Sequence, residues 1–171
     1  MTISLIFLAL ALGLLFWQIS LFISALSGAP TVYAKSDTIR KALRAAQLKA
    51  GQTILDLGCG NARTLIIASR EFGARAIGVE ISPFYYLLAK INVLLNRQKI
   101  PIYYGNIKKF APNIKKADLI YLFLMDKLIA TIAGDVIKHK KSSAKIISIS
   151  FPLPSLRPAQ PSRPPEFYIY E

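Results

Sequence analysis

The sequence predicts an α/β fold, in which a doubly wound and mostly parallel sheet follows one apolar N-terminal helix. Short apolar runs, typical of buried strands, alternate with helical patterns from Asp37 onward. One run, Thr53–Leu57, is broken at once by Gly58 and Gly60, and a helical pattern begins at Leu65. Because strand, glycine turn and helix in this order begin a βαβ unit, the alternation indicates parallel strands with right-handed crossovers.

Composition divides the chain into an expected transmembrane anchor at 1–26, a linker at 27–36 and one α/β domain at 37–171. Ile3–Leu26 is a run of 24 residues without a charge, which is long enough to span a bilayer. A signal peptide is the alternative, since small residues in Ser24–Ala29 suit cleavage. We favour a retained anchor, because no Lys or Arg precedes the run and it exceeds a normal signal-peptide core.

The charges are confined to the part of the chain after the apolar run. All 22 basic and nine acidic residues lie beyond residue 34, and the net charge of +13 suits nucleic acid, anionic lipid or an acidic protein. Lys35, Arg40 and Arg44 follow the run, so the positive-inside rule predicts a single-pass membrane protein with its domain on the cytoplasmic side. The single Cys59 cannot form an internal disulfide, which agrees with a reducing compartment.

The individual elements follow from periodicity and from turn residues. Asp37 is the expected N-cap of the first helix, and Ser82-Pro83 is a helix-start signature. The predicted helices are Asp37–Lys49, Leu65–Phe72, Phe84–Asn96 and Lys127–Lys138. The predicted strands are Thr53–Leu57, Arg75–Val79, Ile102–Tyr104, Asp118–Leu124, Ala144–Phe151 and Phe167–Tyr170.

Parallel strands share one carboxyl edge, and ligands of such sheets bind there. The first helix ends where the first strand begins, so its start, and the anchor before it, should lie at the carboxyl edge. We therefore expect the ligand-binding face to look toward the membrane. Basic residues that precede strands should gather at the opposite edge, unless they are only scattered solubilising charges. These residues are Lys49, Arg75, Arg97, Lys99, Lys115, Lys116, Lys138, Lys140 and Lys141.

The glycine turn favours a cationic ligand over a dinucleotide. Arg63 stands where a dinucleotide-binding loop has its third glycine. Asp56, two residues before Gly58, would repel a pyrophosphate but attract an ammonium or sulfonium. Glu80 follows Gly58 by 22 residues, a spacing that suits an acceptor for ribose hydroxyls. The alternatives are a purely structural glycine turn and a solvated carboxylate at the end of a strand.

The segment Asp56-Leu-Gly-Cys-Gly-Asn61 resembles the first motif of class I methyltransferases, which have a Rossmann-like fold and bind S-adenosyl-L-methionine. The chain as a whole resembles small membrane-anchored members related to the mitochondrial lysine methyltransferases of the ATP synthase c-subunit and the adenine nucleotide translocase. The resemblance implies lysine N-methylation of a membrane-associated protein, without a metal and without nucleic acid as a partner. The matching segments are Gly28–Pro30, Leu55–Arg63, Gly78–Pro83 and Phe151–Pro154.

Three departures from this family weaken the identification of the substrate. Asn61-Ala62 stands where the family usually has an acidic residue and glycine, which puts the conformation of the loop in question. Met125-Asp126 stands where a proline is usual, and the chain ends at Glu171 without the longer carboxyl-terminal part of animal members.

The resemblance also implies roles for single residues. Asp56, Gly58 and Gly60 would surround the methionine part of the cofactor, and Glu80 would accept the ribose hydroxyls. Asn106 would face the adenine, and Phe123 with Leu124 would border the sulfonium. The expected cofactor contacts are Asp56, Gly58, Cys59, Gly60, Glu80, Ile81, Asn106, Ile107 and Phe123.

Asp126 is the catalytic candidate, because an acidic or amide residue at this place orients the incoming amine in other N-methyltransferases. The alternative is a helix N-cap before Lys127. Tyr33 and Tyr85 are candidates for the substrate entrance, or they are packing residues. Two other functions stay open: methylation of a lipid-phase small molecule, such as a quinone or lipid head group, and a non-catalytic cofactor-binding module of a membrane complex.

Overall fold

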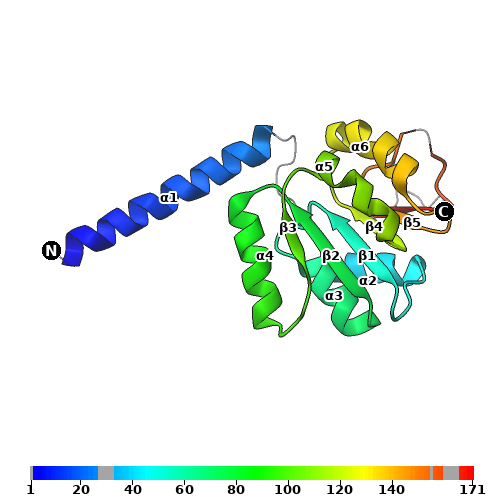
Figure 1. The fold of residues 1–171 in the computed structure, drawn as a ribbon, viewed down its shortest axis with the longest axis horizontal. Coiled ribbons are helices and arrows are strands. Elements are labelled where there is room, and N and C mark those ends of the chain that lie inside the picture. Colours follow the sequence, from blue (N-terminus) through cyan, green and yellow to red (C-terminus); the bar gives the residue numbers. More distant parts are fainter. Residues whose placement is uncertain (1, 27–32, 155, 160–165) are drawn as a thin grey trace.

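The computed structural model describes residues 2–26, 33–154, 156–159 and 166–171 (Figure 1). The predicted segment Gly28–Pro30, most of the linker and part of the proline-rich coil lie outside the described residues. The six strands form one sheet in the order β3-β2-β1-β4-β5-β6, and β6 alone runs antiparallel to its neighbour. The sheet therefore confirms the predicted doubly wound, mostly parallel topology.

The elements alternate as the sequence predicts. The strands are β1 (Thr53–Leu57), β2 (Arg75–Glu80), β3 (Ile102–Tyr104), β4 (Leu119–Leu122), β5 (Lys145–Ile149) and β6 (Phe167–Tyr170). The helices are α1 (Thr2–Leu26), α2 (Ser36–Ala45), α3 (Arg63–Phe72), α4 (Pro83–Leu95), α5 (Ile107–Phe110) and α6 (Asp126–His139), and a 3₁₀ helix η1 covers Ala111–Lys116. Helix α1 is long and apolar enough to cross a membrane or to serve as a signal sequence.

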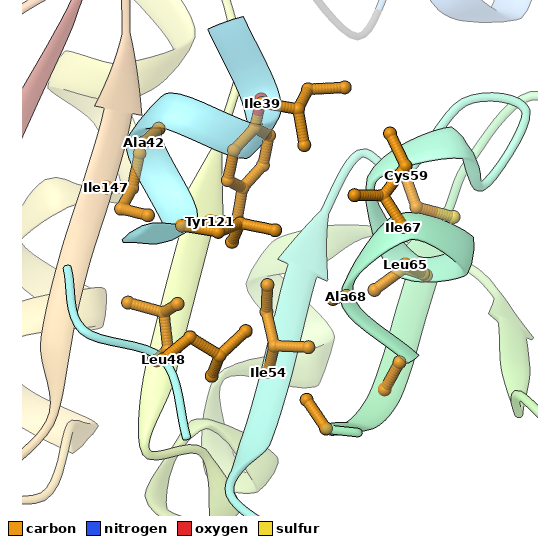
Figure 2. Packing of buried hydrophobic residues seen from close by; sticks show 14 of the residues in the cluster. Ile39, Ala42, Leu48, Ile54, Cys59, Leu65, Ile67, Ala68, Tyr121 and Ile147 are labelled. Carbon is orange, nitrogen blue, oxygen red and sulfur yellow. The ribbon is translucent and has the colours of Figure 1, made fainter. Parts of the chain in front are cut away.

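Two apolar clusters cover the two faces of the sheet. On one face, Ile54 of β1 and Tyr121 of β4 pack with Ile39 of α2 and Leu65 of α3 (Figure 2). On the other face, Leu55 and Leu57 of β1 pack with residues of α5, η1 and α6. Because side chains alternate along a strand, Asp56 points to the same face as Ile54, toward α3. Strand alternation thus places this carboxylate beneath the glycine turn.

Helix α2 differs from the prediction at both ends. It ends at Ala45 and not at Lys49, because Gln47 adopts a left-handed conformation (φ 59°) and the amide of Leu48 donates to the carbonyl of Leu43 at 3.1 Å. The N-cap is Lys35, so the predicted cap Asp37 lies inside the first turn. There its carboxylate pairs with Arg40 at 3.1 Å.

Candidate active site

The turn after β1 is held in an open conformation by its glycines. Gly58 (φ 89°) and Gly60 (φ 54°) occupy the left-handed region that L side chains rarely adopt. The amides of Gly58 and Cys59 both donate to the carbonyl of Val79, at 2.9 and 3.0 Å, which ties the turn to β2. A Cβ on Gly58 would lie 2.7 Å from Cδ2 of Leu124, so a side chain does not fit there without displacing Leu124.

Ala62 stands where the family usually has glycine, and its backbone shows whether the loop keeps the conformation that glycine allows. It adopts φ 62° and ψ 18° directly before α3. This is the left-handed conformation for which glycine is the usual residue. The turn therefore keeps a glycine-like backbone with alanine in place, and the methyl group of Ala62 is fully buried.

Cys59 packs inside the turn. Its sulfur lies 2.8 Å from the position that a Cβ on Gly78 of β2 would occupy, so the thiol fills the space that this glycine leaves. Burial raises the pKa of the Cys59 thiol well above its usual value, and the charges of Asp56 and Glu80 act in the same direction. The side chain is thus a neutral packing group in this structure.

Glu80 connects the two halves of the site. Its side chain is 7% exposed. One carboxylate oxygen accepts a hydrogen bond from the amide of Gly60 and the other accepts one from the amide of Ser82, both at 2.8 Å. The alternative of a solvated strand-end carboxylate is therefore wrong. Burial raises the pKa of Glu80, and the hydrogen bonds from the amides of Ser82 and Gly60 oppose this effect.

Asp56 is a second buried carboxylate, 3% exposed. Burial raises its pKa well above the ordinary value, the charge of Glu80 adds to the effect, and a hydrogen bond with the Thr64 side chain opposes it. Within the described part of the chain, neither Asp56 nor Glu80 takes part in a salt bridge. Two adjacent buried acids without a cationic partner fit a ligand that carries positive charge.

A third polar group lies next to Asp56. Tyr121 of β4 is the register partner of Asp56 and is 1% exposed. Among the described residues its hydroxyl is the buried side-chain oxygen without a hydrogen-bond partner. Burial and the charge of Asp56 raise the pKa of this hydroxyl, and the polar side chain that opposes them is Thr64, which also acts on Asp56.

The adenine and sulfonium candidates lie at the same carboxyl edge. Asn106 is exposed directly after Gly105, and its side-chain oxygen accepts from the amide of Lys108 at 2.9 Å at the start of α5. Ile107 is buried with Leu124 in the apolar cluster on the α6 face, and Phe123 is partly buried on the α3 face. Ile81 follows Glu80 and is partly exposed. The adenine and sulfonium candidates therefore follow β3 and β4, on either side of the β1–β2 pair.

Asp126 is exposed at the first position of α6, where its carboxylate accepts from the amide of Lys127 at 2.7 Å. The helix begins one residue earlier than predicted, so Met125 and not Asp126 occupies the N-cap. One carboxylate oxygen of Asp126 therefore bonds an amide of the first turn of α6, and the exposed side chain also reaches solvent beside the end of β4.

Tyr33, Tyr85 and Arg63 form a cluster over the glycine turn. The sequence predicted the two tyrosines as entrance residues but did not predict Arg63 as their partner. The ring of Tyr33 is 3.8 Å from the position that a Cβ on Gly60 would take. The guanidinium carbon of Arg63 lies 5.7 Å from the centre of that ring, and Tyr85 meets it edge-on at 6.2 Å. The two predicted entrance residues thus do come together, and Arg63 joins them.

The last turns of α1 also meet the site. The hydroxyls of Ser20 and Ser82 are hydrogen-bonded at 2.5 Å, and the amide of Phe84 donates to the Ser20 hydroxyl at 2.9 Å. Ser82 is the N-cap of α4 and lies two residues after Glu80. Helix α1 thus joins the domain at the carboxyl edge, as the order of elements predicted.

Comparisons with known proteins agree with this geometry. An RNA methyltransferase of Salinibacter ruber in complex with S-adenosyl-L-homocysteine shares the fold with a TM-score of 0.75 at 21% identity, over 81% of this chain and 92% of that one. A methyltransferase of Geobacter sulfurreducens, also in complex with S-adenosyl-L-homocysteine, gives a TM-score of 0.60 at 17% identity, over 67% of this chain and 47% of that one. The chain thus has the fold of class I S-adenosylmethionine-dependent methyltransferases.

Sequence comparison then gives the family. Residues 56–160, more than half of the chain, match the ANTKMT methyltransferase domain, and the chain belongs to that family. It is 26% identical over 134 residues to a protein-lysine N-methyltransferase of Saccharolobus islandicus, a match that covers 77% of this chain and 82% of that protein. It is 28% identical over 92 residues to the ribosomal protein L11 methyltransferase of Clostridium perfringens, of which it covers 29%. The protein is therefore an enzyme that uses S-adenosyl-L-methionine.

Proposed function

We propose that the enzyme methylates the ε-amine of a lysine in a membrane-associated protein. Its similarity to a protein-lysine N-methyltransferase supports the nucleophile. The apolar helix α1, which meets the domain beside Ser82, supports a membrane location. In this proposal residues 3–26 span the bilayer, 27–36 link the anchor to the domain, and 37–171 form the catalytic domain on the cytoplasmic side.

The cofactor would lie across the carboxyl ends of β1 and β2. At Gly60 the position of a Cβ lies 3.8 Å from the Tyr33 ring, which leaves the backbone there accessible to the methionine part, and the buried carboxylate of Asp56 would receive its ammonium group. Glu80 keeps unused lone pairs for the ribose hydroxyls, since each of its oxygens accepts one backbone hydrogen bond. The single observation that carries the cofactor's place in this proposal is the pair of buried acids beside a glycine turn, which form no salt bridge with the residues that the structure describes.

The remaining predicted contacts would enclose the rest of the cofactor. Asn106 is exposed and has an amide group that can both donate to and accept from an adenine ring. Phe123 would border the sulfonium at the end of β4. Cys59, Ile81 and Ile107 would contribute backbone or apolar contacts around the turn and the adenine.

The chain's main task in the reaction is to position the amine in its neutral form, after its proton has passed to solvent. The bound cofactor supplies a methyl group on a sulfonium, which needs no acid to leave. A lysine with an ordinary pKa of about 10.4 must lose its proton before it can attack. An apolar wall disfavours the ammonium form, and Asp126, exposed at the start of α6, would orient the amine. Alignment of the reacting atoms can contribute up to about 7–11 kcal/mol.

The test is to incubate membranes with the full chain and cofactor labelled in its methyl group, and then to separate protein from lipid. At a cofactor concentration below the wild-type Kd, we expect label in the protein fraction and about 10-fold to 150-fold less with the Glu80→Gln variant. Label in the lipid extract would support instead a lipid-phase small molecule as the substrate, for which α1 is equally suitable. Label in neither fraction would contradict both functions.

A further inference from the structure

The outward side of helix α4 is apolar over its whole length. Leu87, Ile91, Leu94 and Leu95 follow a helical spacing that places them on one face, which we call the outer α4 face. Leu94 and Leu95 are 74% and 73% exposed, and Leu87 and Ile91 are 50% and 44% exposed. A surface helix of a globular protein normally presents charged and polar residues on this side. From Pro83 to Leu95 the single charged residue is Lys90.

In the described part of the chain, the two apolar clusters of the core do not include these side chains. Ala89 and Val93, on the opposite side of α4, are the buried residues that fix the helix to the sheet. The outer α4 face is thus an apolar surface in addition to the core. Contiguous exposed apolar surface of this kind marks a protein or membrane contact.

The position of α1 favours a membrane contact over a protein contact for the outer α4 face. The apolar span of α1 runs from Ser4 to Ile23, and Ser20 within that span is hydrogen-bonded to Ser82 and Phe84 at the start of α4. When α1 crosses a bilayer, the start of α4 is therefore held at the level of the lipid surface. Figure 1 shows α4 along the flank of the domain from which α1 projects.

The border of the outer α4 face has the composition of a membrane interface. Lys90, Arg97 and Lys99 lie exposed on α4 and in the segment that follows it. Tyr104 is exposed on β3, the strand at the edge of the sheet, and the centre of its ring lies 5.5 Å from that of Tyr86 on α4. Tyrosine and basic side chains around an apolar helix face are typical of helices that lie in the head-group layer of anionic membranes.

We infer that α4 is a second membrane contact, in which the outer α4 face lies in the interfacial layer of an anionic bilayer parallel to its surface. This inference rests on the membrane location proposed above. Two contacts, α1 and α4, would fix the rotation of the domain about the anchor, whereas α1 alone would not. The carboxyl edge would then open beside the lipid surface, where a lysine on a segment emerging from the bilayer can reach it.

Tryptophan fluorescence of the full chain tests this arrangement, since Trp17 in α1 is the single tryptophan. The wild-type chain reports on the anchor, and Leu94→Trp in a Trp17→Phe chain reports on α4. Lys116→Trp in the same Trp17→Phe chain is the matched control, because Lys116 is exposed at the end of η1, directly before β4 and so at the opposite edge of the sheet. Each chain is reconstituted in vesicles that contain phosphatidylglycerol and lipids brominated on their acyl chains, which quench tryptophan on contact.

We expect quenching of Trp17 and comparable quenching at position 94, with none at position 116. Quenching of Trp17 without quenching at position 94 overturns the inference and leaves the anchor intact. Blue-shifted but unquenched emission at position 94 does so as well, because it shows burial against protein, such as a second copy of the chain. Unquenched Trp17 overturns the membrane location and the inference with it. Equal quenching at positions 94 and 116 also contradicts the specific role of α4.

Discussion

The substitution Glu80→Gln should strongly weaken cofactor binding while leaving the fold intact. The carboxylate accepts from the amides of Gly60 and Ser82 at 2.8 Å each and has further lone pairs for a ligand. A glutamine offers one oxygen, so one backbone amide loses its acceptor and the ribose loses an ionised partner. Hydrogen bonds to charged groups are worth about 1.5–3 kcal/mol. At about 1.4 kcal/mol per factor of ten, the Kd for S-adenosylhomocysteine should rise about 10-fold to 150-fold.

Isothermal titration calorimetry measures this change directly, and circular dichroism confirms that the variant is folded. Glu71→Gln is the matched control, because it removes the same charge from an exposed site on α3 where Glu71 pairs with Arg40 at 2.8 Å. Its affinity should equal that of the wild type. The reasoning about Glu80 is refuted if Glu80→Gln also binds S-adenosylhomocysteine with wild-type affinity.

Three further predictions concern the site and the opposite edge of the sheet. Burial raises the pKa of Asp56, so between its ordinary pKa and the raised pKa the folded state keeps a proton that the unfolded chain has lost. The free energy of unfolding should therefore fall as the pH rises from the ordinary pKa through the raised pKa. Asp56→Asn should make this fall smaller in urea unfolding of the cofactor-free protein at a series of pH values, leaving the part that the raised pKa of Glu80 contributes; an unchanged profile would show that folding does not raise the pKa of Asp56. Ala62→Gly should change the free energy of unfolding by less than about 1 kcal/mol, because relief of the left-handed alanine (about 1–2 kcal/mol) offsets the lost methyl group and the added chain entropy. Ala68→Gly, equally buried in α3, lacks this relief and should cost about 1.5 kcal/mol, so equal losses would contradict a strained Ala62. Reversing the charges of Lys115 and Lys116 should leave methylation of membranes intact, and lost activity with retained cofactor binding would place the docking surface at that edge.

The sheet could be predicted from the sequence because its strands are short apolar runs with clear ends. The bounds of β1, β3 and β6 agree with the prediction to the residue, and β1 is followed directly by Gly58. Helix α5 and the 3₁₀ helix were missed, since each is too short for a periodic pattern and Pro112 interrupts them. The early end of α2 was missed because Gln47 carries no sequence signal for the left-handed conformation that stops the helix.

The two carboxylates of the candidate site could be predicted from the sequence, but the contacts between residues far apart in the sequence could not. The stretch from Gly58 to Glu80 consists of the glycine turn, one helix and the second strand of the βαβ unit. The sequence alone therefore predicts that Glu80 lies beside the glycine turn. The hydrogen bond between Ser20 and Ser82 joins residues 62 positions apart, and no local pattern indicates it. The exposure of the outer α4 face could not be predicted for another reason. A mostly apolar helix is normally predicted to be buried, and only the structure shows that this face is not covered by other described residues.

The central claim is that the enzyme places methyl groups on lysine. Membrane protein labelled by the full chain with methyl-labelled cofactor can be hydrolysed to amino acids and separated by chromatography. We predict that the label elutes with N-ε-methylated lysine and that, at a cofactor concentration below the wild-type Kd, it falls about 10-fold or more when Glu80→Gln replaces the wild-type enzyme. Label that elutes with any other amino acid, or that stays in the lipid extract, would contradict the account.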